Sequence, residues 1–231
     1  EIVDCDWSSD VCSSDLRFVT VGGAIASDIH GKNHHVGGSF GRHVRRMSML
    51  LADGSLVELD PTSSLFWATV GGMGLTGVIL DATIELLPVE TSLMSVDTSR
   101  IPDLDTLMAA MTEGDDHVRY SVAWIDLMAR GRSLGRSVLT RGDHATRAQL
   151  PSRAQDEPFG YDPREVVSVP PIVPGPGVLN RLTVAAFNEF WYRKAPRARR
   201  DELQTIASFF HPLDLVGSWN RLYGQIGRAH V

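Results

Sequence analysis

One segment of the chain, Thr20 to Gly41, gathers most of the residues that could do chemistry. It holds six glycines, three histidines and one lysine, and it follows an apolar run, Arg17 to Val21, that is typical of a β-strand. Because glycine loses much conformational entropy on folding, this density indicates a main chain that must come close to a ligand. We therefore expect a ligand-binding loop here.

A glycine pair, Gly22 and Gly23, comes directly after the expected strand. Backbone N–H groups with no side chain in the way can approach a phosphate and offset its charge. The spacing matches neither the Gly-x-Gly-x-x-Gly fingerprint nor a P-loop, so it predicts neither a nicotinamide Rossmann site nor an NTPase. A tight turn without a ligand would use the same pair.

Imidazoles and an ammonium group gather at His30, Lys32, His34 and His35. A histidine can orient a flavin ring and stabilise charge on it, and a lysine can hold an anionic group or polarise a hydroxyl. His30 and Lys32 are therefore the candidate catalytic residues of a flavin site. A solvated polar loop is one alternative. A metal site is another, but Gly31 interrupts the helical spacing and no acidic ligand is near, so we expect no metal.

Ser39 lies in a Gly-x-Ser-x-Gly pattern, residues 37–41, which is typical of the nucleophile elbow of α/β-hydrolases. That elbow requires a hydrophobic strand directly before it, whereas residues 32–35 are polar. A serine hydrolase is therefore an outside alternative.

A second glycine-rich segment, residues 67–77, leads into a strand-like run, residues 78–87. Its small residues suit a backbone that passes under a flat ring, although close packing of a strand on a helix would need them equally. Two such segments about fifty residues apart favour a bound ring more than either segment does alone.

The composition changes after Pro88, where the glycine density falls, and we expect a domain boundary there. Asp53-Gly54 predicts a tight hairpin turn. The hydrophobic patterns predict strands at residues 17–21, 47–51, 55–59, 78–87, 118–127 and 136–140, helical segments at 65–70, 104–111 and 201–210, and a proline-rich loop or flap at 156–177.

Aromatic side chains stand out in the second half, at Trp124 and at residues 190–192, with Arg193 and Lys194 beside them. Such walls suit a lipid-like or sugar substrate that carries phosphate, although a plain hydrophobic core would use the same residues.

The two ends of the chain, residues 1–16 and 226–231, are interpreted as not native. Residues 6–16 back-translate into a common sequencing-adapter oligonucleotide, and residues 226–231 into its complementary partner. Both cysteines lie in the first segment, so no disulfide is expected. Without the five acidic residues and one arginine of these segments, the net charge changes from −6 to −2, which does not favour nucleic-acid binding. No run approaches the roughly 20 apolar residues of a membrane span.

Four motifs carry a resemblance to a known family. They are Ile25 to His35, Leu65 to Gly72, Phe190 to Lys194, and Phe210 to Asp214. The chain resembles the vanillyl-alcohol-oxidase, or PCMH-type, FAD-binding oxidoreductases, and within them the decaprenylphosphoryl-β-D-ribose 2′-oxidases, over nearly all of residues 17–225.

The resemblance implies an α+β fold. Residues 17–90 would form the second lobe of a PCMH-type FAD-binding domain, and residues 91–225 part of an α+β substrate (cap) domain with an antiparallel sheet. The first FAD lobe, and C-terminal strands with a lysine and a tyrosine near the flavin, would lie outside this chain. We therefore expect the chain by itself to be inactive and not to hold FAD.

The resemblance also assigns site residues. Those that would line FAD are Thr20, Val21, Gly22, Gly23, Ser27, Asp28, Ile29, His30 and Ile79. Those that would face the substrate are Gly31, Lys32, Val122, Trp124 and Tyr192. The family has a serine where Val122 stands, so a polar contact is expected to be missing.

The implied reaction is oxidation of the ribose 2′-hydroxyl of a polyprenyl-phosphate sugar to a 2′-keto sugar. A quinone or oxygen would accept the electrons, and a separate short-chain reductase would complete the epimerisation to arabinose for cell-wall arabinan. The resemblance implies a place in the cell envelope or at a membrane, where the basic residues 193–200 could touch anionic lipid, although a solvated surface is the more ordinary interpretation. A sugar-lactone (aldonolactone) oxidase of the same family and a binding module without catalysis are the alternatives.

Overall fold

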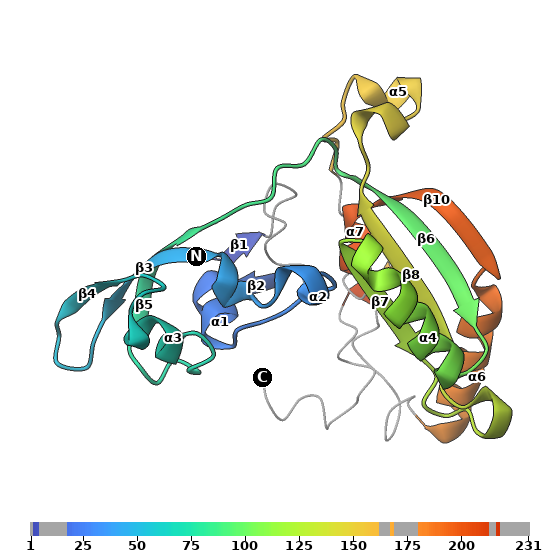
Figure 1. Cartoon of the computed structure of the whole chain (residues 1–231), viewed down its shortest axis with the longest axis horizontal. Coiled ribbons are helices and arrows are strands. Elements are labelled where there is room, and N and C mark those ends of the chain that lie inside the picture. Colours follow the sequence, from blue (N-terminus) through green and yellow to red (C-terminus); the bar gives the residue numbers. More distant parts are fainter. Residues whose placement is uncertain (1, 5–17, 162–166, 169–179, 213–215, 218–231) are drawn as a thin grey trace. The chain divides into compact units, whose positions relative to one another are not determined.

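The structure, a computed structural model, describes residues 2–4, 18–161, 167–168, 180–212 and 216–217 (Figure 1). The chain divides into two compact units, unit 1 from Glu1 to Glu90 and unit 2 from Thr91 to Val231. Both units combine helices with antiparallel sheets, so the predicted α+β class is confirmed. No helix in the described part of the chain is both long and apolar enough to cross a bilayer.

Unit 1 is built on a three-stranded antiparallel sheet in the order β4-β3-β5. A separate two-stranded antiparallel sheet joins β1 to β2. The elements are β1 (Ile2–Asp4), β2 (Phe18–Thr20), α1 (Val21–Ala26), α2 (His34–Gly37), the 3-10 helix η1 (Phe40–His43), β3 (Val44–Leu50), β4 (Leu56–Leu59), α3 (Ser64–Thr69) and β5 (Val78–Ile84).

The hairpin predicted at Asp53-Gly54 is confirmed between β3 and β4. Gly54 takes the positive φ of 83° that the turn needs, and the Asp53 carboxylate accepts hydrogen bonds from the Ser55 N–H (2.9 Å) and hydroxyl (2.6 Å). The helical turn at residues 65–70 is confirmed as α3. β3 begins three residues earlier than predicted, and β5 ends three residues earlier.

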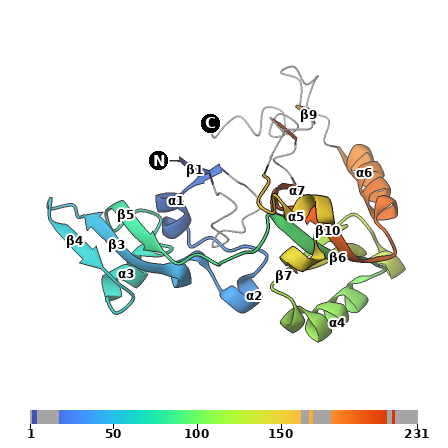
Figure 2. The same cartoon turned by 90° about the horizontal axis from the view of Figure 1, so that it is seen from above.

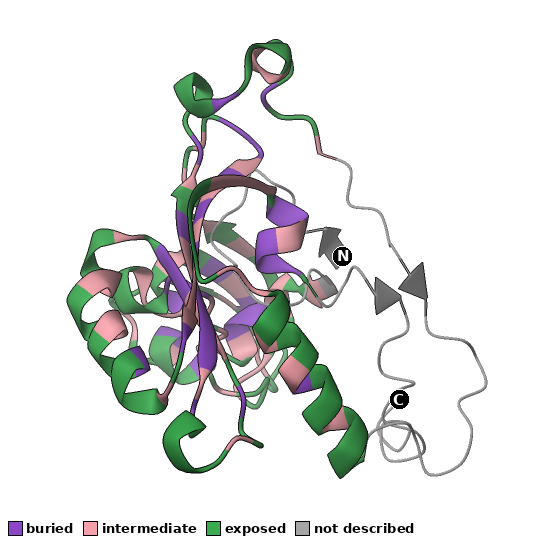
Figure 3. Ribbon diagram, turned by 90° about the vertical axis from the view of Figure 1, so that its right-hand side faces the viewer, coloured by how far each residue is buried: buried purple, intermediate pink, exposed green. Residues whose placement is uncertain are grey.

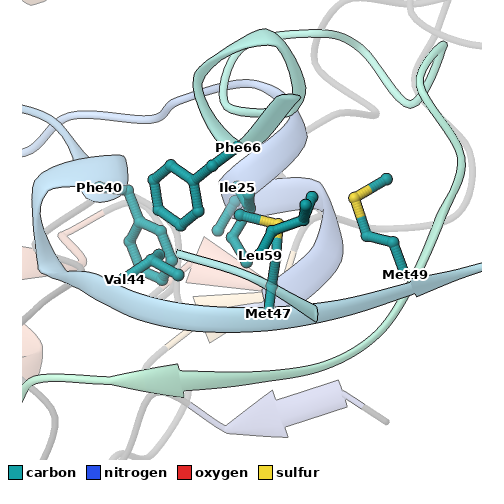
Figure 4. Packing of buried hydrophobic residues seen from close by; sticks show 8 residues of the cluster. Ile25, Phe40, Val44, Met47, Met49, Leu59 and Phe66 are labelled. Atoms are coloured by element: carbon teal, nitrogen blue, oxygen red, sulfur yellow. The ribbon is translucent and has the colours of Figure 1, made fainter. Parts of the chain in front are cut away.

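One apolar cluster joins the elements of unit 1 (Figure 4). Its largest members are Ile25, Phe40, Val44, Met47, Met49, Leu59 and Phe66, none more than 6% exposed. Because they come from α1, η1, β3, β4 and α3, burial of this cluster fixes α1 against the sheet.

Unit 2 is built on a four-stranded antiparallel sheet in the order β10-β6-β8-β7. A short parallel pair joins β9 to β11. The elements are β6 (Leu93–Ile101), α4 (Leu104–Gly114), η2 (Asp115–His117), β7 (Tyr120–Ile125), η3 (Gly131–Ser133), β8 (Ser137–His144), η4 (Arg147–Gln149), α5 (Ser152–Gln155), β9 (Val167–Ser168), α6 (Arg181–Lys194), β10 (Ala198–Thr205), α7 (Ile206–Phe210) and β11 (Val216–Gly217).

The two faces of this sheet carry different helices (Figure 2). Leu107 of α4 packs with Leu139 and Ala123 on one face. Tyr120 contacts the α7 rings of Phe209 and Phe210. Since Tyr120 and Ala123 are three residues apart on one strand, α4 and α7 cover opposite faces.

Several predictions for unit 2 are confirmed. Helix α4 begins behind Asp103, whose carboxylate accepts a hydrogen bond from the Thr106 N–H (2.8 Å). The strand predicted at residues 118–127 is present as β7 and pairs with β8, with Trp124 opposite Val138. The predicted proline-rich loop at residues 156–177 lies largely outside the described residues.

The helix predicted at residues 201–210 is wrong over its first half. Ala198–Thr205 is strand β10, which pairs with the edge of β6, and only Ile206–Phe210 is helical. The backbone hydrogen bonds to β6 outweigh the weak helical stripe of apolar residues. Thr205 then caps α7 by accepting a hydrogen bond from the Ser208 N–H (3.2 Å).

Candidate functional site

The first glycine pair lies in a helix, and the loop predicted there is wrong. Gly22 and Gly23 form the first turn of α1, which follows β2 directly, and the Thr20 hydroxyl accepts a hydrogen bond from the Gly23 N–H (3.1 Å). A Cβ on Gly23 would lie 2.8 Å from that hydroxyl, whereas a Cβ on Gly22 would meet nothing within 4 Å. The turn therefore presents bare backbone to open space at Gly22.

The second glycine-rich segment meets the end of the same helix. The Gly71 N–H donates to the carbonyl of Ile25 (3.0 Å), and the Met73 N–H donates to the carbonyl of Ala26 (2.8 Å). Gly71 and Met73 both have left-handed backbones, with φ of 73° and 53°. The structure thus brings the two glycine-rich segments together within unit 1, as a shared ligand site requires.

The Asp28 side chain, close to this junction, is hydrogen-bonded to the segment that contains Ser39 and Gly41. Its carboxylate accepts hydrogen bonds from the Ser39 hydroxyl (2.7 Å) and the Gly41 N–H (2.9 Å). Asp28 itself has φ of 42°, in the left-handed region that Asp tolerates better than most residues. Both carboxylate oxygens of Asp28 are thus engaged in holding the segment that contains Ser39 and Gly41.

The structure also weakens the hydrolase alternative. Ser39 has an extended backbone (φ −92°, ψ 172°), follows the short helix α2 and precedes a 3-10 helix. A nucleophile elbow needs a strand before the serine and a sharp turn into a helix after it. The Ser39 hydroxyl instead donates a hydrogen bond to the Asp28 carboxylate.

The histidine and lysine residues have different surroundings. Lys32 is only 7% exposed, whereas His30 is exposed. The His30 ring lies 5.3 Å from the ring of His34, and His34 Nδ1 lies 3.1 Å from the carbonyl of Gly31. Among the described residues, no three side chains of His, Cys, Asp or Glu are grouped to hold a metal ion. The candidate catalytic pair therefore combines one enclosed cation with one accessible imidazole.

Three other residues predicted to line FAD lie against the same group of buried side chains. Val21, Ile29 and Ile79 are partly buried and pack against the apolar cluster of unit 1. Val21 is the first residue of α1, Ile29 follows this helix, and Ile79 comes from β5. Residues of the first glycine-rich segment and of the strand after the second thus pack on one core.

In unit 2, Val122 and Trp124 lie on β7 in register with Tyr120, so all three side chains share the α7 face of the sheet. Tyr192 lies on α6. Asp126, the residue after β7, holds this helix at the same end of the sheet through a hydrogen bond from Asn188.

Asp126 forms the centre of a buried polar network. Its side chain is 1% exposed. Arg136 donates from Nε (2.9 Å) and Nη2 (2.7 Å) to Asp126 Oδ2, and Asn188 of α6 donates from Nδ2 to Asp126 Oδ1 (2.7 Å). Because a buried charge must be paired, these contacts fix α6 to the β7–β8 end.

Tyr192 is held by the same network. The guanidinium of Arg136 lies 4.8 Å from the centre of its ring, and that of Arg100 lies 5.4 Å from it. Arg136 Nη1 also pairs with Glu189 Oε2 (2.6 Å), one turn before Tyr192 on α6. Cation–π contacts and the ion pair together set the position of the tyrosine ring.

The charge state of the network follows from its hydrogen bonds. Burial by itself would raise the pKa of Asp126, but the hydrogen bonds from Arg136, Asn188 and the Met128 N–H outweigh it, so this pKa lies below its ordinary value. The carboxylate and the guanidinium are both charged at neutral pH.

Sequence reasoning missed Asp126, Arg136, Asn188 and the helix α6 that carries Asn188. One signal was present, since Asp126 lies near the end of one predicted strand and Arg136 starts the next, which places opposite charges across a hairpin.

Comparison with known proteins adds a second line of support. No family model matches the chain. Over 91% of its length the chain is 46% identical to the protein of Mycolicibacterium smegmatis named decaprenylphosphoryl-beta-D-ribose oxidase. The resemblance seen in the motifs is confirmed.

A second relative of this chain is a Streptomyces coelicolor protein described as an uncharacterized protein in the mprA 5′ region, which is 40% identical over 85% of the chain. The chain covers 46% of the oxidase and 55% of the second protein, so it spans about half the length of the curated relatives it matches.

Proposed function

We propose that this chain is part of an FAD-dependent oxidoreductase that oxidises the 2′-hydroxyl of ribose on a polyprenyl phosphate to a ketone. The observation that carries the proposal is the 46% identity, over 91% of the chain, to an oxidase named for such a sugar. The meeting of the two glycine-rich segments supports it. Under this proposal, residues 17–90 are the second lobe of a PCMH-type FAD-binding domain and residues 91–225 are part of the substrate domain.

The residues of unit 1 fit FAD. The open space beside Gly22 leaves room for a phosphate-bearing group against bare backbone, and Ile29 and Ile79 offer an apolar support for a ring. When bound, FAD supplies the acceptor for two electrons and the carbon-bound hydrogen. Residues 20–23 and 27–30, with Ile79, would hold it.

Lys32 is proposed to act on the substrate hydroxyl. An enclosed ammonium can donate a hydrogen bond to the hydroxyl oxygen and favour the loss of its proton, and the low solvent exposure of Lys32 strengthens that effect. Gly31, the residue before Lys32, would face the substrate as well. His30 would stabilise negative charge at the cofactor edge.

Unit 2 is proposed to supply the substrate wall. Trp124 and Tyr192 offer aromatic faces for a sugar ring, and the Asp126–Arg136 network holds the tyrosine in place. Val122 leaves this wall apolar at one point.

The partners follow from the same proposal. They are a polyprenyl-phosphate sugar as substrate, a quinone or oxygen as electron acceptor, and a short-chain reductase that completes an epimerisation to arabinose for the cell wall. A polyprenyl tail remains in a bilayer, so we also propose a place in the cell envelope with peripheral membrane contact.

The test is flavin reduction in the full-length protein under anaerobic conditions. A short-chain polyprenylphosphoryl ribose should bleach the flavin absorbance in a single turnover, and the 2′-deoxy analogue, which lacks the reacting hydroxyl, should not. Turnover on a soluble sugar lactone instead would favour an aldonolactone oxidase. Bound FAD that no polyprenyl-phosphate sugar bleaches would favour a binding module.

A further inference from the structure

Helix α6 has an inner face that is fixed by polar contacts. Asn188, Glu189 and Tyr192 all contact residues of the sheet end, namely Asp126, Arg136 and Arg100. The helix starts at Asn180, whose side chain accepts hydrogen bonds from the Leu182 N–H (2.9 Å) and the Thr183 N–H (3.1 Å). With one face tied down and one end capped, the opposite face has a defined direction.

The opposite face of α6 is apolar and exposed, and the helix shows little buried surface (Figure 3). Its large apolar side chains are Phe187 (54% exposed), Phe190 (62%) and Trp191 (37%). Phe190 lies two residues after Asn188, which places it on nearly the opposite side of the helix. Three large aromatic residues on one outward face are more than scattered exposure explains.

Aromatic rings and a cation follow one another along this face. The rings of Phe187 and Trp191 are stacked, with centroids 5.9 Å apart, and Lys194 Nζ lies 5.7 Å from the centre of the Trp191 ring. Tryptophan and lysine side chains, each with an apolar body and a polar end, are common at the boundary between hydrocarbon and water.

Basic residues outnumber acidic residues in and around helix α6. Residues 180–200 contain six basic residues and one acidic residue, Glu189, which pairs with Arg136 and Arg193. Within the described part of the chain, no carboxylate pairs with Arg181, Lys194 or Arg197. The anionic headgroups of a lipid surface would complement these cations.

We propose that the outward face of α6, defined by Phe187, Phe190 and Trp191 with Lys194, docks on membranes that carry anionic lipid. The apolar side chains enter the headgroup boundary and the basic residues contact lipid phosphates. This inference deepens the membrane contact proposed above and rests on that proposal for its biological purpose. One helix then faces lipid on one side and carries Tyr192 of the substrate wall on the other.

The test is co-sedimentation of the full-length protein with vesicles of phosphatidylglycerol and phosphatidylcholine, or of phosphatidylcholine alone. The wild type should bind the anionic vesicles and lose binding as salt rises. Phe187→Ser with Phe190→Ser should weaken binding by at least about tenfold, and Lys194→Ala by about fivefold. Met108→Ser is the control, since Met108 is an exposed apolar residue on another helix of unit 2, α4, and the variant should bind as the wild type does.

A second measurement uses a conservative change. Brominated lipid in the anionic vesicles should quench tryptophan fluorescence of the wild type, and Trp191→Phe should abolish most of that quenching. Wild-type binding by the double serine variant, unchanged quenching in Trp191→Phe, or equal binding to neutral vesicles would overturn the proposal.

A single substitution separates this inference from the proposed activity. Phe187→Ser by itself, which leaves the aromatic residues 190–192 unchanged, should keep single-turnover bleaching by a water-soluble short-chain substrate and lose turnover of substrate embedded in vesicles. If vesicle binding holds while no substrate bleaches the flavin, the proposed function fails and the docking surface stands.

Discussion

Two carboxylates, Asp28 in unit 1 and Asp126 in unit 2, organise the candidate site residues in different ways. Asp28 accepts hydrogen bonds from neutral donors, a hydroxyl and an amide, that lie 11 and 13 residues further along the chain. Asp126 accepts them from a guanidinium and from an amide of α6, 62 residues away. The first closes a local loop, whereas the second holds together elements that are distant in sequence.

This difference suggests separate roles for the two units. The loop that Asp28 closes carries His30 and the enclosed Lys32, so unit 1 would govern the chemical step. The network around Asp126 holds Tyr192 and α6, so unit 2 would govern the substrate wall.

The largest effect is expected at Lys32. Lys32→Met keeps the volume of this enclosed side chain and removes its charge, so we expect flavin reduction in a single turnover of the full-length protein to slow by about a thousandfold. Flavin content should not change. Trp124→Phe in unit 2 is the comparison, and it should change substrate affinity more than the reduction rate. An unchanged reduction rate in Lys32→Met would remove this residue from the reaction.

The next effect tests the network of unit 2. Asp126→Ala leaves the Arg136 guanidinium, which is 17% exposed, without its main partner, so we expect the free energy of unfolding to fall by about 3 kcal/mol. Arg200→Ala is the control, because it breaks an exposed ion pair with Asp97 and should cost at most about 1 kcal/mol. Urea unfolding measures both. Equal losses would mean that the buried network stabilises no more than a surface pair.

A smaller effect is expected in unit 1. Asp28→Ala leaves the Gly41 N–H without its acceptor and should cost about 1–2 kcal/mol, whereas Asp28→Asn keeps an acceptor and a residue that tolerates positive φ, and should cost less than about 1 kcal/mol. Amide hydrogen exchange at Gly41 should speed up in the alanine variant. Protection that stays the same in Asp28→Ala would show that the loop closes without this carboxylate.

Local signals explain what the sequence predicts well. The Asp53-Gly54 turn, the start of α4 at Asp103 and the two strands β7 and β8 each depend on neighbouring residues, and each is confirmed. The glycine pair at residues 22–23 indicated open backbone but not a helix, because a strand that runs directly into a capped turn leaves no separate loop signal.

Distant contacts explain what the sequence could not show. β10 is a strand because the edge of β6 pairs with it, and the helical stripe of Leu203, Ile206 and Phe210 gave no sign of that partner. α6 was missed because its apolar side chains point outward and its inner face is polar, the reverse of the pattern of a helix on a core. Asp126 and Asn188, 62 residues apart, could be paired only in the fold.

The smallest effect is in the acid dependence of stability. The folded pKa of Asp126 is lower than its ordinary value of 3.8, since the hydrogen bonds from Arg136 and Asn188 overcome the effect of burial. A lowered folded pKa gives a stabilisation that is complete above the ordinary value and is lost as the pH falls through the folded pKa. The free energy of unfolding of the wild type should therefore exceed that of Asp126→Asn by a constant amount from pH 7 to about pH 5, and the gap should narrow as the pH falls below about 4. Urea titrations across this range measure the gap, and one that stays constant or widens in acid would place the stabilising charge of unit 2 elsewhere.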